Sequence, residues 1–421
     1  MFSPLIKPVW HHTPGQTAPG STMQNTQKTP LSLGAIILLG TLTAIGPMSI
    51  DMYLPSFPSI QQSLHTEAGM VQWTLASFFI GLALGQLFYG PISDRFGRKP
   101  PLYFGMLLYA AASAGCMVAP NIETLIACRF LQALGGCTGM VICRAIVRDR
   151  CEPQAAARIF SMLMLVMGLA PILAPLLGGW LAVHASWRVL FGIQVAFGLI
   201  CVTGIHFGLT ETIDRHKAAP LHLGSVLQGY GLLLRDRWFL GYTLCSGLAS
   251  AGMFAYITGS PFVLINLHGI PAEHFGWVFG SNAFGLILAS QLNTRFLKAN
   301  DIDTLLRRAL WSPFLAGLLL LITTWLHIDA LYVLLPCLFF FVAAIGFIGP
   351  NASAAALKHH GARAGLASAL MGSLQFTLAT LVGFLMGAWQ DPSARPLATL
   401  MCLCGVCAWL VHRTLVMRQS Q

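Results

Sequence analysis

Charged residues are scarce in this chain. Asp, Glu, Lys and Arg make up only 9% of its 421 residues, while 56% are hydrophobic and the mean hydropathy is +0.70. An ordinary soluble domain carries roughly 25% charged residues. The shortage excludes water as the main solvent of the chain and predicts an integral membrane protein. The first 30 residues lack an apolar core of signal-peptide length, so we expect residues 1–30 to form a disordered tail.

Motifs of soluble-enzyme chemistry are also missing. No phosphate-binding G-x-x-x-x-G-K-[ST] segment occurs, so ATP is not expected as the energy source. The histidine pairs at 11–12 and 359–360 lack the i, i+4 spacing of a helical metal site. Cys404 and Cys407 lie in an apolar run without redox context, which is typical of packing residues. We predict no enzyme activity, no catalytic residue, no metal and no cofactor, and the proton gradient remains as energy source.

Apolar runs of about 20 residues recur along the sequence, and this is the length that a helix needs to cross about 30 Å of hydrocarbon. Charged residues gather between the runs. The pattern predicts an all-α integral membrane fold with twelve spans, at residues 32–56, 70–92, 101–119, 122–146, 156–183, 187–209, 238–265, 273–295, 305–327, 330–357, 362–389 and 395–416.

The basic residues predict the orientation, because Lys and Arg in short loops are retained on the cytoplasmic side. With both termini inside, all 24 Lys and Arg residues except Arg129, Arg188 and Arg395 fall in or beside cytoplasmic segments. A shift by one helix destroys this segregation. We therefore predict a multi-pass protein of the bacterial inner membrane with both termini cytoplasmic. The net charge of +10 then reflects topology and contact with anionic lipid heads, and gives no indication of nucleic-acid binding.

The most polar internal stretch, residues 210–237, divides the spans into two sets of six. We predict an N-terminal six-helix bundle at 31–209, a cytoplasmic linker at 210–237 and a C-terminal six-helix bundle with a short cytoplasmic tail at 238–421. Two bundles related by an axis along the membrane normal form a known transporter plan, in which the substrate site lies between them near the midplane.

One short segment, which we call the loop signature, lies between the second and third predicted spans. It reads Gly90-Pro-Ile-Ser-Asp94-Arg95-Phe-Gly97-Arg98-Lys99. Gly90 and Gly97 permit close approach and a tight turn, and Asp94 offers a carboxylate to the backbone N–H groups of a neighbouring helix start. The basic residues predict that the loop stays inside.

The loop signature closely resembles the G-x-L-A-D-R-x-G-R-K motif of the major facilitator superfamily, which occurs at the same loop. The resemblance implies two six-helix bundles around a central cavity. It also implies a gate at the cytoplasmic side, formed by Asp94, Arg95 and Arg98 with the two glycines. The corresponding loop of the second half, around Asn293–Arg295, keeps little of the pattern, so the resemblance implies no matching gate there.

Arg129 lies well inside an apolar run, in Arg129-Phe-Leu-Gln132-Ala-Leu-Gly-Gly136. A cation in the hydrocarbon is costly and usually faces the bundle interior or a water-filled cavity, so it is a functional hypothesis by default. An Arg satisfied by backbone carbonyls that only joins helices is the alternative. The stretch resembles the R-x-x-Q-G motif of the superfamily, with Ala133 at the glycine position. The resemblance points to a role of Arg129 in proton coupling.

Asp51 is the only acid that the predicted spans place inside the hydrocarbon away from loop edges. It lies about 27 Å along the first span, and Arg129 lies roughly 10 Å from the outer end of the fourth, so both occupy the outer half of the membrane. A carboxylate that is desolvated but near a cation can change its protonation as water access changes, which a proton carrier requires. An Asp that caps backbone freed by Pro47 and Pro55 is the compatible structural alternative.

The fifth predicted span contains two prolines and a glycine pair. It reads Gly168-Leu-Ala-Pro171-Ile-Leu-Ala-Pro175-Leu-Leu-Gly178-Gly179-Trp180. Small residues alone would explain close helix contact. The segment is also similar to the antiporter motif of drug-exporting members of the superfamily, with Ala174 at one glycine position. The similarity implies export rather than import.

Four segments together look like the Bcr/CflA branch of drug–proton antiporters: Asp51–Pro55, Arg129–Gly136, Arg144–Asp149 and Ala174–Pro175. The resemblance implies efflux of small amphipathic drugs, such as bicyclomycin or chloramphenicol-type antibiotics, by proton antiport, and it adds Arg144 and Arg148 to the gate. Export of a metabolite such as an amino acid by the same mechanism is the alternative. An importer, a membrane-embedded enzyme and a receptor are less favoured.

Substrate contacts are expected from Met and aromatic side chains, which adapt to varied apolar shapes. Each such residue alone is more often core or lipid-facing. The expected partners are a small-molecule drug or metabolite, protons and membrane lipids, and we expect a monomer. By position, the candidates for the cavity are Met48, Tyr53, Phe78, Gln132, Met140, Met253, Phe254, Tyr256 and Phe376.

Overall fold

The structure is a computed structural model that describes residues 31–212, 223–328, 330–389 and 391–417. Within these residues the chain is helical and forms no strand. The predicted tail at 1–30, residues 213–222 of the predicted linker and residues 418–421 lie outside the described part. The predicted domain limits therefore stay predictions.

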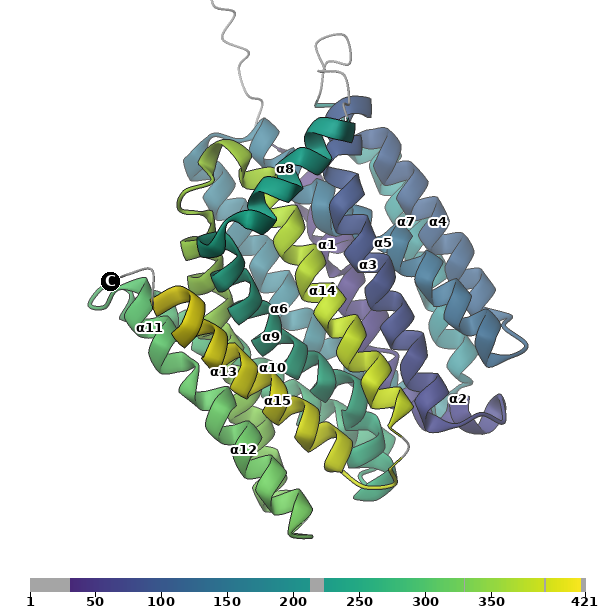
Figure 1. The fold of residues 1–421 in the computed structure, drawn as a ribbon. Coiled ribbons are helices and arrows are strands. Elements are labelled where there is room, and N and C mark those ends of the chain that lie inside the picture. The colour runs from purple at the N-terminus through teal and green to yellow at the C-terminus, as the bar shows by residue number, and fades with distance from the viewer. Residues whose placement is uncertain (1–30, 213–222, 329, 390, 418–421) are drawn as a thin grey trace, which may run out of the picture.

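The first bundle contains the helices from α1 to α7 (Figure 1). Its first span is broken: α1 (Leu33–Asp51) is followed by the 3-10 turn η1 (Leu54–Ser56) and by α2 (Phe57–Ser63). The other helices are α3 (Ala68–Phe96), α4 (Lys99–Met117), α5 (Ile122–Arg150), α6 (Pro153–His184) and α7 (Trp187–Gly208).

The linker helix α8 (Leu223–Arg235) leads into the second bundle. This bundle contains α9 (Arg237–Ser260), η2 (Pro261–Leu267), α10 (Ala272–Phe296), α11 (Ile302–Ala309), α12 (Trp311–Trp325), α13 (Leu331–Leu357), η3 (Gly361–Arg363), α14 (Ala364–Ala388), α15 (Arg395–Val411) and η4 (His412–Val416).

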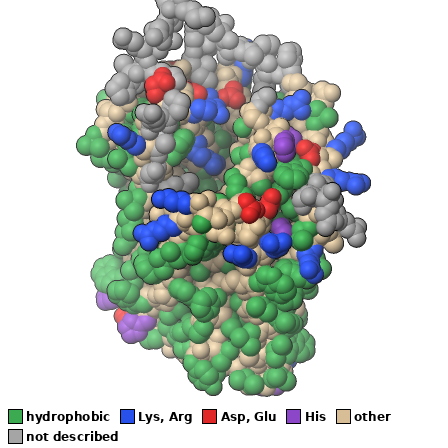
Figure 2. All heavy atoms as spheres, turned by 90° about the vertical axis from the view of Figure 1, so that its left-hand side faces the viewer, with side chains coloured by type: hydrophobic (Ala, Val, Ile, Leu, Met, Phe, Trp, Pro, Cys, Tyr) green, Lys and Arg blue, Asp and Glu red, His purple; other side chains and the backbone are tan. Residues whose placement is uncertain are grey.

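Ten helical stretches of the described residues are long and apolar enough to cross a membrane. The other two predicted spans, 101–119 and 273–295, coincide with α4 and α10. Figure 2 shows Lys and Arg side chains over the upper part of one face, above a lower part that is largely hydrophobic. The predicted all-α membrane fold with two six-helix bundles is confirmed.

Glycines let α3, α4 and α5 pack with their backbones close together. A Cβ atom at Gly81 would collide with the Phe130 carbonyl, and one at Gly105 would collide with Thr138. A Cβ atom at Gly135 would reach the backbone of α4 in the same way. Small residues at helix contacts are the usual means of tight packing in membranes. These contacts fix α5, which carries Arg129, against its neighbours.

We call the end of the molecule that carries residues 90–99 the signature end and the opposite end the far end. At the far end, α3 of the first bundle packs against α14 of the second (Figure 1). The Trp73 indole N–H donates to the Phe384 carbonyl at 3.3 Å, and a Cβ atom at Gly69 would overlap the Gly387 carbonyl. Helices α6 and α10 also meet there. The far end is therefore closed by contacts between the bundles.

Candidate functional site

A cavity of about 250 Å³ lies between the two bundles. Helices α1, α3, α5 and α6 line it from the first bundle, and α9, α10, α13 and α14 line it from the second. Most of the lining is apolar, and the polar side chains are those of Asp51, Tyr256 and Asn282. Ligand pockets usually measure about 300–1,000 Å³. The site therefore suits a small, mainly apolar ligand with few polar groups.

The predicted cavity residues divide into two groups in the structure. Met140, Met253, Phe254, Tyr256 and Phe376 line the cavity. Met48 is half-buried outside the lining, and Tyr53, Phe78 and Gln132 contact Arg129 instead, because their helix faces point into the first bundle.

Asp51 is the last residue of α1, lines the cavity and is 5% exposed. Among the described residues that line this cavity, Asp51 is the sole charged one. Its carboxylate forms no hydrogen bond or ion pair with a described residue. An unpaired buried charge is costly. A charged Asp51 therefore needs a compensating group, which a proton or a positively polarised ligand group can supply.

Arg129 on α5 is completely buried in a cage of polar and aromatic groups. Its guanidinium donates to Gln132 Oε1 at 2.5 Å and to the Ser49 carbonyl at 3.0 Å. Its Cζ atom lies 4.6 Å from the ring centre of Tyr53 and 4.2 Å from that of Phe78. No carboxylate of the described chain pairs with it. Carbonyl and cation–π contacts stabilise this cation.

The Ser49 carbonyl is available to Arg129 because α1 ends here. In a continuous helix the Tyr53 N–H would bond this carbonyl, but it donates to the Ile50 carbonyl at 3.3 Å. Arg129 thus caps the C-terminal end of α1, where the helix dipole stabilises a cation. Asp51 follows Ser49 by two residues. Arg129 therefore positions the Asp51 backbone without contacting its carboxylate, and the predicted roles of both residues in proton coupling stay predictions.

A buried polar network extends from Arg129 through the first bundle. Gln132 Nε2 donates to Ser113 Oγ and to Gln194 Oε1, each at 2.6 Å. The hydroxyls of Ser49 and Tyr109 bond each other at 2.8 Å. The network joins α1, α4, α5 and α7. Gln132 could be identified from the sequence, but the other members could not, because isolated polar residues in separate spans carry no joint pattern.

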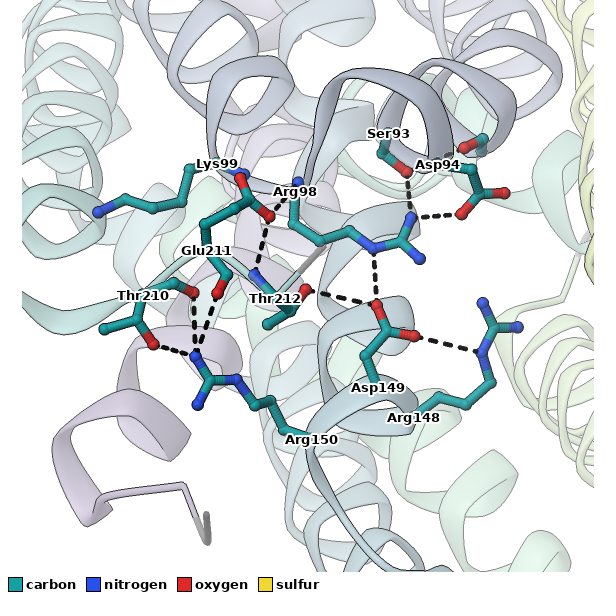
Figure 3. A network of polar contacts seen from close by, with 11 residues as sticks. Ser93, Asp94, Arg98, Lys99, Arg148, Asp149, Arg150, Thr210, Glu211 and Thr212 are labelled. Atoms are coloured by element: carbon teal, nitrogen blue, oxygen red, sulfur yellow. Dashed lines mark hydrogen bonds and ion pairs between the residues drawn. The ribbon is translucent and has the colours of Figure 1, made fainter. Parts of the chain in front are cut away.

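Arg98 is the centre of a second network, at the signature end (Figure 3). Its guanidinium donates to Asp94 at 2.6 Å, to Ser93 Oγ at 2.7 Å and to Asp149 at 2.9 Å. The Arg98 side chain is 4% exposed, whereas that of Asp94 is 62% exposed. Between α3 and α4 the chain turns at Gly97 with φ +91°, a conformation that favours glycine. The network ties the ends of α3 and α5 to the start of α4.

Glu211, three residues after the end of α7, caps the start of α4. Its carboxylate accepts the backbone N–H of Arg98 at 2.8 Å and that of Lys99 at 3.1 Å. Arg150 of α5 donates to the Glu211 carbonyl at 3.3 Å. A Cβ atom at Gly97 would collide with the Glu211 carboxylate in its present position, so a larger residue there would displace this cap. Glu211 falls within the predicted linker at 210–237, and no role was predicted for it.

A crevice of about 310 Å³ lies between the loop signature and the start of α14, and several of the predicted gate residues line it. Arg144 lines it and donates to the Met140 carbonyl at 3.1 Å. Arg148 lies 3.9 Å from Asp149. Gly90, Asp94, Arg98 and Arg148 line the crevice as well. Arg95 lies outside its lining and forms no hydrogen bond or ion pair with a described residue.

The Major Facilitator Superfamily profile matches residues 39–384. The chain belongs to this superfamily. It is 37% identical to an uncharacterised transporter of the superfamily from Bacillus subtilis, over 88% of this chain and 92% of that protein. It is 33% identical to a bicyclomycin resistance protein homologue from Haemophilus influenzae (91% and 96% covered). It is 29% identical to multidrug resistance protein D from Escherichia coli (93% and 98% covered).

Solved structures of other transporters share the fold. A D-xylose–proton symporter superposes with a TM-score of 0.68 at 14% identity, covering 89% of this chain and 97% of the other. A nucleoside transporter superposes with a TM-score of 0.71 at 12% identity, covering 91% and 98%. The named sequence relatives confirm the resemblance to the Bcr/CflA branch of the superfamily.

The glycine pair of the fifth span brings α6 of this superfamily member against both bundles. A Cβ atom at Gly178 would overlap the Met52 carbonyl beside the α1 break. One at Gly179 would collide with the Ala272 carbonyl of α10. Helix α6 therefore connects the α1 break to the second bundle. The two prolines of the antiporter-like segment lie inside α6. Pro171 lines the cavity, and Pro175 lies about one turn further on.

Proposed function

We propose that this protein exports small amphipathic drugs, such as bicyclomycin or chloramphenicol-type antibiotics, across the bacterial inner membrane in exchange for protons. The observation that carries the proposal is the position of Asp51, the sole charged residue among the described residues of the cavity between the bundles. The printed names of two relatives, a bicyclomycin resistance protein homologue and multidrug resistance protein D, support a substrate of this class.

The exchange follows from the charge balance of the cavity. With a proton on Asp51 the cavity is neutral, and without it the carboxylate needs a compensating group. A drug that offers a positive charge or a hydrogen-bond donor compensates the carboxylate, while its apolar body contacts the Met and Phe side chains of both bundles. Drug and proton then oppose each other's binding, and this coupling is reciprocal. Outward movement of the drug is exchanged for inward movement of the proton.

Arg129 tunes this exchange through α1. Its bond to the Ser49 carbonyl holds the end of the helix that carries Asp51. This contact fixes the position of Asp51 at the cavity.

The gate lies at the signature end, which we assign to the cytoplasm. Contacts between Trp73 and Phe384 close the far end, while the crevice beside Asp94 separates the bundles at the signature end. This arrangement fits an inward-open state. Closing the crevice brings the exposed Asp94 carboxylate towards the start of α14, where helix N–H groups stabilise an anion. Both termini in the cytoplasm, contact with anionic lipids and a monomeric state belong to the same proposal.

The test is drug-driven proton movement in proteoliposomes. Wild type, Asp51→Asn and Asp391→Asn are compared with chloramphenicol, bicyclomycin and several amino acids as substrates. We expect a drug to move protons with wild type and with Asp391→Asn, whose carboxylate lies outside the cavity, and not with Asp51→Asn. An equal response of Asp51→Asn and wild type would show that proton coupling lies elsewhere. A response to amino acids alone would replace drug efflux by metabolite export.

A further inference from the structure

Pro91 leaves a backbone carbonyl of α3 without its helical partner. In an α-helix the Leu87 carbonyl accepts the N–H of residue 91, but proline has no N–H. Pro91 lies inside α3, directly after Gly90 at the beginning of the loop signature. A carbonyl of this kind, when buried between helices, costs free energy unless another donor bonds it.

The missing donor comes from the linker helix. The Tyr230 hydroxyl of α8 donates to the Leu87 carbonyl at 2.9 Å. Tyr230 is 8% exposed and packs in an apolar cluster with Leu233 and Leu370. Burial raises the pKa of Tyr230 to about 12, so the hydroxyl keeps its proton at physiological pH. The hydroxyl therefore remains a hydrogen-bond donor at every pH at which a proton gradient operates.

Helix α8 is attached to the second bundle. Asp236 alone separates α8 from α9, and its carboxylate accepts the Trp238 N–H at 2.8 Å, which fixes the start of α9. On its inner face, Gly229 of α8 lies against Leu366 of α14. Figure 1 shows α8 across the signature end, above α9 and α14. Any motion of the second bundle relative to the first therefore moves α8 relative to α3.

The hydrogen bond between Tyr230 and Leu87 thus crosses from the second bundle to the first at the signature end. At the far end, the bond between Trp73 and Phe384 crosses in the same way, at 3.3 Å. The bundles are tied at the far end because it is closed. At the signature end, they are tied beside an open crevice. A hydrogen bond at an open end fixes the distance between the two bundles while that end is open.

We propose that Tyr230 is a positioning residue of the gate, whose hydroxyl holds the linker helix on α3 through the Leu87 carbonyl that Pro91 leaves free. The bond exists while the signature end is open and breaks when that end closes. The inference rests on the proposed alternation between two states. Pro91 has a defined part in it, because its lack of an N–H leaves the Leu87 carbonyl without a donor within α3.

The test is hydrogen–deuterium exchange of the full-length protein in detergent. Tyr230→Phe removes the hydroxyl and keeps the ring. We expect exchange to slow at the signature end, in residues 86–96 and 364–372, and to accelerate at the far end, in residues 68–75 and 380–388. Each change is expected to be roughly fivefold, the factor that corresponds to one net hydrogen bond. Faster exchange at both ends would indicate loosened structure and would overturn the proposal, as would no change.

Pro91→Ala supplies the matched background. The substitution places an N–H where the Leu87 carbonyl can accept it within α3, so the carbonyl no longer depends on Tyr230. In this background we expect Tyr230→Phe to change exchange by less than twofold. Equal effects of Tyr230→Phe in both backgrounds would show that the bond to Leu87 is not responsible, and the proposal would be rejected.

The exchange measurement needs neither drug nor proton gradient. If Tyr230→Phe shifts exchange as expected while no drug moves protons, the gate inference stands and the efflux proposal fails. If drugs move protons while exchange is unaffected by Tyr230→Phe, the efflux proposal stands and the role of Tyr230 is withdrawn.

Discussion

Glu211→Gln tests whether the start of α4 positions the gate. The Glu211 carboxylate accepts the backbone N–H of Arg98 at 2.8 Å and that of Lys99 at 3.1 Å. A capping side chain contributes about 0.5–2 kcal/mol, and a negative charge at a helix start about 0.3–1 kcal/mol. The amide keeps one acceptor oxygen, loses the charge and sets an NH2 group against one of the N–H groups. We expect the free energy of unfolding to fall by about 1–2 kcal/mol.

Because Glu211 holds the backbone of Arg98, we expect the same change to shift the Arg98 guanidinium away from Asp94 and Asp149. Because Glu211 lies outside the cavity, drug binding is expected to change less than twofold, measured by quenching of the intrinsic tryptophan fluorescence. The maximal rate of drug-driven proton movement is expected to fall by roughly 5- to 30-fold, the factor that corresponds to 1–2 kcal/mol. A variant with lowered stability but an unchanged maximal rate would refute the positioning role of Glu211.

Asp301→Asn is the matched control. Asp301 also caps a helix, α11, and its carboxylate accepts the Thr304 N–H at 2.9 Å. It lies far along the chain from the Arg98 network, so the maximal rate is expected to stay at the wild-type value. The Thr304 N–H holds the pKa of Asp301 below its ordinary value. The cap therefore contributes stability at neutral pH and loses it as the pH falls through the folded-state pKa, so the difference between Asp301→Asn and wild type disappears in acid. Equal rate losses in both variants would refute the specificity of Glu211.

Three further changes test the cavity, its neighbouring network and the closed far end. Arg129→Lys cannot reach both carbonyl partners of the guanidinium, so it is expected to lower the free energy of unfolding by about 1.5–3 kcal/mol in thermal denaturation. The Asn282 Nδ2 group donates to the Tyr256 hydroxyl at 2.8 Å, and Tyr256→Phe leaves this donor without a partner. The free energy of unfolding is expected to fall by about 1–3 kcal/mol, and adding Asn282→Leu is expected to restore most of it. Gly387→Val places a side chain against Trp73, so faster hydrogen exchange is expected at residues 68–75, and unchanged exchange there contradicts the assignment of this contact to far-end closure.

The arrangement of spans could be predicted from sequence because two strong signals agree. The cost of exposing polar backbone to hydrocarbon forces long apolar helices, and the retention of Lys and Arg on one side orders them. The predicted spans at 101–119 and 273–295 coincide with α4 and α10, although these helices are less apolar than the rest. The loop signature could be identified because its residues are contiguous. Its Asp94 and Arg98 pair as neighbours on the chain.

Contacts between distant residues could not be predicted in this way. Glu211 lies 113 positions from Arg98, and Tyr230 lies 143 positions from Leu87. The sequence around Glu211 or around Leu87 contains no pattern that indicates which residue it bonds. Pro91 was the one usable signal, because a proline in a helix interior leaves the carbonyl four residues earlier without its backbone donor.

The residues that line the cavity could be predicted only in part. Tyr53 and Phe78 are aromatic residues near Asp51 in the predicted spans, yet their rings face Arg129. Met167, Phe279 and Asn282 line the cavity and were missed. Which face of a membrane helix meets a cavity depends on its rotation about its axis. Apolar residues surround such a helix on all sides, so hydrophobic periodicity does not report that rotation.

Proton release on drug binding tests whether Asp51 exchanges a proton for the drug. The purified protein in weakly buffered detergent solution is mixed with chloramphenicol or bicyclomycin, and the pH is followed with an indicator dye for wild type and Asp51→Asn. We predict that the drug releases protons from wild type in proportion to its binding and releases none from Asp51→Asn. Proton release of equal size from both proteins would contradict it.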